Sequence, residues 1–144
     1  MVEINKYIKN LIKHGFCSFK KENSLSDVTA DIPAGYGVFI LRKNKEDGEI
    51  LYVGYSGTFD KKTRKFKKQQ LKGRIINKHG KQRREDFLIQ KMKEDSTLQQ
   101  IIIEWYIIDE NKYLPSDVKK DLLQGYYLKH KRLPIWNKQT LPLR

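Results

Sequence analysis

Two short apolar segments joined by a charged turn constrain the fold of this chain more than any other feature. Residues 37–42 and residues 49–54 are rich in β-branched, aromatic and aliphatic side chains, and the turn between them carries Asp47 and Gly48. An Asp-Gly pair in a short connection between two apolar runs is a strong signal for an antiparallel hairpin. We therefore predict that these two segments are neighbouring strands of one sheet.

The segments around this hairpin show mainly helical periodicity. Apolar side chains recur at helical spacing at the N-terminus, which predicts an amphipathic helix over residues 3–14. Residues 18–36 are polar and are broken by proline and glycine, which indicates a connection. After the hairpin, a helix should contain residues 71–78 and stop near Gly80, and a second helical pattern covers residues 83–94.

The C-terminal third of the chain predicts one more strand and one more helix. Residues 101–108 form a nearly continuous apolar run, which is typical of a buried strand. Pro115 starts a last helix with a buried apolar stripe, and this helix ends before Pro134. The fold expected is an α/β domain over residues 1–144, with a small, mainly antiparallel three-stranded sheet flanked by helices.

The net charge narrows the class of partner. Thirty lysines and arginines stand against seventeen acidic residues, which gives a formal charge of +13 and predicts a strongly anionic partner. Cys17 is the only cysteine, and no apolar run approaches the roughly 18 residues of a membrane span, so we expect a soluble cytoplasmic protein. Nucleic acid is the leading candidate partner, because the basic stretch lacks the apolar face that a membrane-surface helix needs.

The positive charge is concentrated in one segment. Between residues 61 and 84 the chain carries no acidic side chain and twelve basic ones: Lys61, Lys62, Arg64, Lys65, Lys67, Lys68, Lys72, Arg74, Lys78, Lys81, Arg83 and Arg84. A merely solubilising helix face usually mixes both signs of charge, so an unmixed block favours a phosphate-contacting surface.

Several of these residues, taken in order, resemble the GIY-YIG endonuclease superfamily over about residues 35–138. Gly37-Val38-Phe39 and Tyr52-Val53-Gly54 stand where that family has its two strand motifs. Arg74 falls in the helix after the second strand, as the family arginine does, and Pro134-Ile135-Trp136-Asn137 resembles the closing tail. Each match alone is weak, and their order and spacing make the combination specific.

The resemblance implies a GIY-YIG nuclease-like fold and a metal-dependent endonuclease that hydrolyses phosphodiester bonds of DNA. Such hydrolysis needs an activated water, a cation over the developing phosphate charge, and a metal ion. By position, Tyr52 would orient or deprotonate the water and Arg74 would face the phosphate. Lys78 and His79 stand where the family often has a histidine or tyrosine, and Gln124 stands where it has the glutamate that holds Mg²⁺ or Mn²⁺.

Two positions depart from the family pattern. Phe39 has no hydroxyl, so its role would fall to Tyr52, Tyr55 or Tyr36. Gln124 is a neutral amide, which is a poor magnesium ligand. Three interpretations stay open: an engineered isosteric replacement, a natural loss that leaves a non-catalytic nucleic-acid-binding protein, or substitution of the ligand by Asp121 on the preceding turn.

The expected partner is double-stranded DNA, and a symmetric specific cutter would act as a homodimer. The segment 55–70 is the candidate for contacts to base edges. The residues predicted to contact nucleic acid are Tyr55, Lys61, Lys62, Arg64, Lys65, Lys67, Lys68, Lys72, Arg83, Arg84 and Asn137. Besides a nuclease and a non-catalytic nucleic-acid-binding protein, a third possible function is that of a basic ribosome- or RNA-associated protein in which the strand motifs are coincidental.

Overall fold

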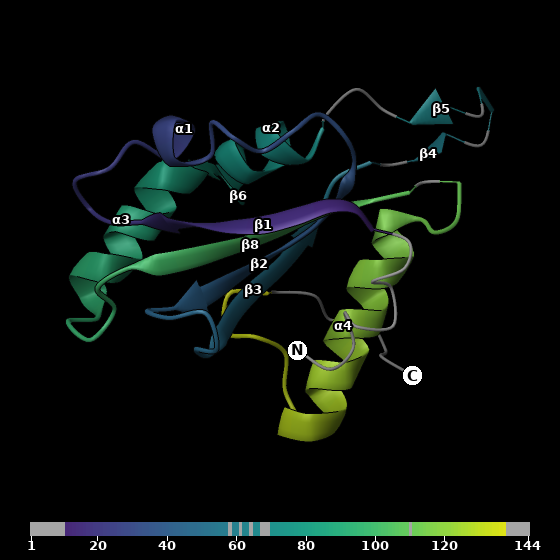
Figure 1. Cartoon of the computed structure of the whole chain (residues 1–144). Helices are drawn as coiled ribbons and strands as arrows, with labels where there is room; N and C mark the ends of the chain where they lie inside the picture. Colours follow the sequence, from purple (N-terminus) through teal and green to yellow (C-terminus); the bar gives the residue numbers. More distant parts are fainter. Residues whose placement is uncertain are drawn as a thin grey trace.

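The fold is built on a four-stranded antiparallel sheet with helices on both faces (Figure 1). The computed structural model describes residues 11–57, 59–60, 62–63, 65–66, 70–109 and 111–137. The strand order is β1 (Leu11–Phe19), β8 (Ile101–Ile108), β2 (Gly37–Lys43) and β3 (Ile50–Tyr55). β1 and β3 are therefore the edge strands, and the apolar run of β8 lies in the middle, as its composition predicts.

The predicted hairpin is confirmed. β2 and β3 pair antiparallel with Leu41 opposite Tyr52 and Phe39 opposite Gly54. Asn44 opens the turn with a positive φ of 66°, a conformation that asparagine tolerates better than most residues. Side chains of a strand alternate between the two faces, so Phe39 and Tyr52 share one face, and Val38 and Val53 share the other.

The sheet has one strand more than the sequence predicts. Residues 11–14, which were expected to end a helix over residues 3–14, lie in β1, and the rest of that predicted helix falls outside the described residues. In β1, Ile12 is 62% exposed and Phe16 is 54% exposed. The apolar spacing there does not reflect burial, and this is why it misled.

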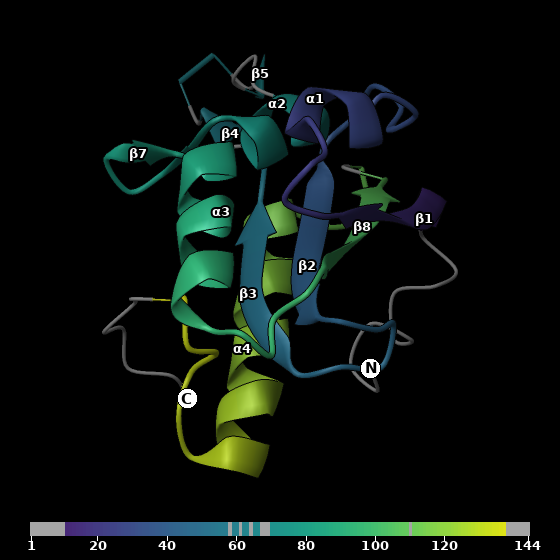
Figure 2. The ribbon, with the colours of Figure 1, turned by 90° about the vertical axis from the view of Figure 1, so that its left-hand side faces the viewer.

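The helices form a layer on each face of the sheet. α1 (Leu25–Val28), α2 (Leu71–Ile76) and α3 (Arg84–Glu94) lie on one face, and α4 (Pro115–His130) lies on the other (Figures 1 and 2). The α3-side core is made of Phe19, Leu25, Ile32, Phe39, Leu41, Leu51, Leu71, Ile75, Leu88, Met92, Leu98, Ile101, Ile103, Ile107 and Trp136. The α4-side core is made of Val38, Ile40, Ile50, Val53, Ile108, Val118, Leu122, Leu123 and Tyr126. No helix in the described part of the chain is long and apolar enough to cross a membrane.

α2 is shorter than the helix expected over residues 71–78. It ends at Ile76, and the chain then forms a small hairpin of β6 (Lys78–His79) and β7 (Gln82–Arg83). Gly80 forms the turn of this hairpin with a φ of 66°, so the glycine ends a hairpin turn rather than a helix. Upstream, β4 (Phe59–Asp60) pairs with β5 (Lys65–Phe66) within the segment predicted to read bases.

Candidate functional site

Tyr52 lies in a chain of aromatic rings on the α3 side of the sheet, close to the edge strand β3. We call Phe39, Tyr52, His79, Phe87 and Trp136 the Tyr52 cluster. The Tyr52 ring centroid lies 5.7 Å from that of Phe39 and 4.7 Å from that of His79. His79 stacks on Phe87 at 3.7 Å, and Phe87 meets Trp136 edge-on at 5.3 Å. The structure thus brings together the predicted site residues Tyr52 and His79 from β3 and β6.

The strand-motif glycine Gly54 permits this arrangement. It lies opposite Phe39 in the hairpin, and a Cβ atom added to Gly54 would overlap the Phe39 ring and crowd Tyr52. Any larger residue at position 54 would displace the ring of Phe39 and disturb the neighbouring ring of Tyr52. Phe39 therefore packs as a core aromatic in contact with Tyr52, and it provides no hydroxyl there.

Arg84 is a buried residue that contacts the rings of the Tyr52 cluster from the interior of the protein. Its side chain is fully buried, and its guanidinium lies 5.2 Å from the Phe39 ring centroid and 5.0 Å from that of Tyr52. Its nitrogens donate to the carbonyl oxygens of Ile75 at 3.2 Å and Arg74 at 3.4 Å. Burial lowers the pKa of Arg84, the positive charge of Arg74 acts in the same direction, and Tyr52 opposes them.

The prediction that Arg84 contacts nucleic acid is wrong. A side chain without exposed surface cannot reach a partner, and this guanidinium instead fixes the end of α2. Its Nη1 also lies 2.6 Å from His79 Nδ1. Because an arginine can only donate, His79 Nδ1 accepts this bond and the ring carries its N–H at Nε2. Arg84 therefore orients the imidazole beside Tyr52.

Asn137, which was predicted to contact nucleic acid, uses its side-chain amide to bind the backbone of β3. Its amide accepts from Val53 N at 2.9 Å and donates to Val53 O at 3.0 Å. The neighbouring Trp136 N donates to Leu51 O at 2.9 Å. The C-terminal tail thus pairs with the outer edge of β3, which satisfies backbone groups of that strand and seats Trp136 in the Tyr52 cluster.

A second cation, Lys119 of α4, lies on the other face of the sheet, beside β3. Lys119 is buried in the apolar stripe of α4, and its Nζ lies 5.2 Å from the ring centroid of Tyr55. Burial, and then the positive charge of Arg74, lowers the pKa of Lys119 to about 8. The sequence does signal Lys119, because it precedes Leu122, Leu123 and Tyr126 at helical spacing and so falls on the buried stripe.

Gln124 and Asp121, the residues proposed for the metal, are not directed toward Tyr52. They follow Lys119 by five and two residues, which rotates them by about 140° and 160° away from it around the helix axis. α4 lies on the face of the sheet opposite the Tyr52 ring. No cluster of three or more histidine, cysteine, aspartate or glutamate side chains that could hold a metal ion occurs among the described residues.

The predicted basic contacts are only partly described. Lys61, Arg64, Lys67 and Lys68 lie outside the described residues, and of Lys65 only the backbone is described. Lys62, Lys78 and Lys81 are exposed, Lys72 is half-buried, and Tyr55 is half-buried under Lys119. Arg83 is exposed but forms a two-pronged ion pair with Asp86 at 3.0 and 3.2 Å, which neutralises part of its charge.

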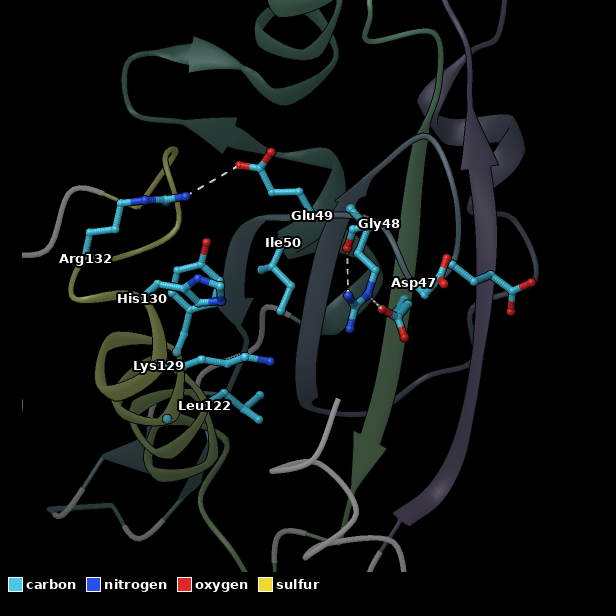
Figure 3. A pocket seen from close by; sticks show the side chains of 13 residues that line it. Asp47, Gly48, Glu49, Ile50, Leu122, Lys129, His130 and Arg132 are labelled. Carbon is cyan, nitrogen blue, oxygen red and sulfur yellow. Dashed lines mark hydrogen bonds and ion pairs between the residues drawn. The ribbon is translucent and has the colours of Figure 1, made fainter.

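A cavity of about 560 Å³ lies elsewhere, between the β2–β3 turn and the C-terminal end of α4 (Figure 3). Its walls carry both signs of charge, with Glu49 paired to Arg132 across the opening at 3.9 Å and Lys129 and His130 beside them. None of the predicted site residues lines it. Its mixed charge does not suit a polyanion, so we do not take it as the site.

Comparisons of the chain with protein-family models, with curated proteins and with solved structures found no match.

Proposed function

We propose that the chain binds double-stranded DNA with the basic surface of α2 and the β6–β7 hairpin, on a GIY-YIG-like scaffold. The observation that carries the proposal is that most of the cations on this surface have no acidic partner. Among the described residues, Lys72, Arg74, Lys78 and Lys81 form no ion pair with a carboxylate, and only Arg83 does. Uncompensated cations on adjoining elements attract a polyanion and release its counterions on binding.

The salt dependence of binding tests this proposal. The affinity for a DNA duplex, measured by fluorescence anisotropy, should fall linearly with salt on a logarithmic plot. The variant Lys78→Gln/Lys81→Gln should reduce the slope by about 2, roughly one unit for each lost phosphate contact. Lys45→Gln, in the β2–β3 turn at the opposite end of β3, is the matched control and should leave the slope unchanged. A salt-independent affinity would exclude the proposed surface.

Phosphodiester cleavage is the second candidate, and it is favoured by the contact of Tyr52 with His79 next to the guanidiniums of Arg84 and Arg74. A phenol and an imidazole in contact can exchange a proton with an attacking water. Binding needs only the cations described above, whereas cleavage would also need a metal ligand, and no group of three or more histidine, cysteine, aspartate or glutamate side chains among the described residues is arranged as one. Binding is therefore our first proposal.

Incubation with supercoiled DNA and Mg²⁺ or Mn²⁺ separates the two candidates. We expect binding without cleavage both for the chain and for Gln124→Glu, because position 124 lies on the side of α4 turned away from the sheet. If the chain does cleave and Tyr52→Phe abolishes cleavage while retaining affinity, the nuclease interpretation replaces ours. Cleavage by the Gln124→Glu variant, but not by the unchanged chain, would show that position 124 holds the metal ion. If the unchanged chain cleaves and Asp121→Asn does not, the metal ion would be assigned to Asp121.

A further inference from the structure

The cavity between the β2–β3 turn and the C-terminal end of α4 has walls of opposite charge. Its strand side carries the acidic side chains of the turn, Glu46, Asp47 and Glu49. Its helix side carries Lys129 and His130 of α4, and Arg132 directly after the helix. Figure 3 shows Lys129 reaching from α4 into the cavity toward the strand side. A ligand in this cavity therefore meets carboxylates on one side and cations on the other.

The buried part of the cavity lining is apolar. Ile50, Leu122 and Tyr126 line the cavity and belong to the α4-side core. The two buried charges that also line it, Arg42 and Glu104, form an ion pair with each other. Because that pair neutralises itself, the charges left for a ligand are those of the turn and of the end of α4.

The cavity is large enough for a small organic molecule. Its volume of about 560 Å³ lies within the range of about 300–1,000 Å³ that is typical of small-molecule sites. Gly125 lies on its helix wall, in the interior of α4, where glycine is less favourable than alanine. A side chain on this wall would take up part of the volume, so the glycine leaves room where a better helix former would not.

We propose that this cavity binds a small zwitterion with an apolar middle, its carboxylate at Lys129 and its ammonium at Glu49. A ligand with one sign of charge is attracted by one wall and repelled by the other, whereas a zwitterion is attracted by both. Its apolar part would cover Ile50 and Leu122. The Glu49–Arg132 pair across the opening is exposed and 3.9 Å long, so it is weak and can open for the ligand.

A free apolar amino acid and a short apolar peptide both carry this chemistry. Neither is part of the DNA binding proposed above, and the cavity lies at the opposite end of β3 from Tyr55. The site and the DNA-binding surface can therefore stand or fall separately.

Titration of the ¹⁵N-labelled chain, followed by NMR at the backbone amides of Gly48 and Gly125, measures binding at the cavity. The probes are leucine, the dipeptide of two leucines, and two singly charged analogues of leucine, isopentylamine and 4-methylpentanoate. We expect saturable shifts with at least one zwitterion and affinities about tenfold weaker for both analogues, the size of one lost charge-assisted hydrogen bond. Tighter binding of leucine assigns the site to a free amino acid, and tighter binding of the dipeptide assigns it to a peptide.

Substitutions test which wall binds which end of the ligand. Lys129→Gln should weaken binding of the zwitterion about tenfold and leave the affinity for isopentylamine unchanged, because the amine has no carboxylate to lose. Glu49→Gln should do the reverse, weakening the zwitterion and leaving 4-methylpentanoate unchanged. Gly125→Leu should abolish binding by filling the cavity, and thermal unfolding establishes that α4 remains packed. Lys120→Gln, exposed on the same helix and outside the cavity lining, is the matched control.

Two results would overturn this site. One is that none of the four probes shifts the amides of the cavity, or that a singly charged analogue binds as tightly as the zwitterions. The other is that Lys129→Gln and Lys120→Gln bind the zwitterion equally well.

Discussion

Arg84→Met should lower the free energy of unfolding by about 3 kcal/mol or more, because each buried acceptor left without a donor costs about 1–3 kcal/mol. Three acceptors lose their partner in this variant, namely Ile75 O, Arg74 O and His79 Nδ1. Methionine fills much of the volume, so the loss reports the hydrogen bonds more than a cavity. Urea unfolding followed by circular dichroism measures the change.

Two further variants, Arg83→Met and Arg84→Lys, test whether the hydrogen bonds of Arg84 cause this loss of stability. Arg83→Met, one residue earlier and exposed, should leave the unfolding midpoint unchanged even though it removes the same charge. Arg84→Lys should fall between the two, because one ammonium cannot serve three acceptors arranged around a planar fork. If Arg83→Met and Arg84→Met cost the same, the guanidinium does not hold the end of α2, and the orientation of His79 needs another cause.

The elements that the sequence predicts well are those whose burial follows a simple period. The apolar runs and the Asp-Gly turn predict β2 and β3, and the unbroken run at 101–108 predicts the central strand β8. The expected helix over 83–94 is α3 within one residue, and Pro115 begins α4 as predicted. In each case one face or both faces of the element are buried, so the pattern of apolar residues reports the structure directly.

The errors occur where tertiary contacts decide the structure. β1 is a strand because it pairs with β8 over its whole length, and no local pattern in residues 11–19 indicates that pairing. Gly80 suits a helix end and a hairpin turn equally well, and only the pairing of Lys78 with Arg83 selects the turn. The fourth strand and the shortened α2 both follow from such non-local pairing.

The candidate site shows the same division. Tyr52 and His79 do come together, but Arg84 was placed with the exposed cations because the basic run hides its spacing. Arg84, Leu88 and Met92 recur every four residues and form the buried stripe of α3, just as Lys119 belongs to the stripe of α4. Helical phase, applied to charged residues as well as apolar ones, would have identified both residues.

Helical phase also explains why Lys119, and not Gln124, is the side chain of α4 that faces the sheet. Gln124 was assigned from its spacing to the C-terminal tail, and that spacing does not determine which way the side chain points. A shift of one residue along a helix turns the side chain by about 100°. The contacts of α4 with β2 and β3 set that direction, and they turn Val118, Lys119 and Leu122 toward the sheet. The side chain that α4 places on this face of the sheet, beside Tyr55, is therefore the cation Lys119 and not Gln124.

The ion pair of Arg42 with Glu104 should be the other large contributor to stability. Both side chains are largely buried, at 9% and 17% exposure, below the cavity at the end of α4. Arg42 also donates to Gly48 O at 2.9 Å, and Glu104 accepts from the Tyr106 hydroxyl at 2.8 Å. Burial, and then the charge of Glu104, raises the pKa of Tyr106, so this hydroxyl stays a donor.

Glu104→Leu should cost about 3–5 kcal/mol of unfolding free energy, because it leaves the Arg42 charge buried without a counter-ion. The double variant Arg42→Met/Glu104→Leu should recover much of that loss, since a buried ion pair and an apolar pair of similar volume differ little in stability. Glu49→Gln, which breaks the exposed pair with Arg132, should change the midpoint little. Equal losses in the single and double variants would mean that Glu104 acts through Tyr106 alone. Recovery in the double variant would instead establish that the loss of stability comes from the unpaired Arg42. The double variant should still bind DNA, because this ion pair lies at the opposite end of β3 from Tyr55 and Lys119.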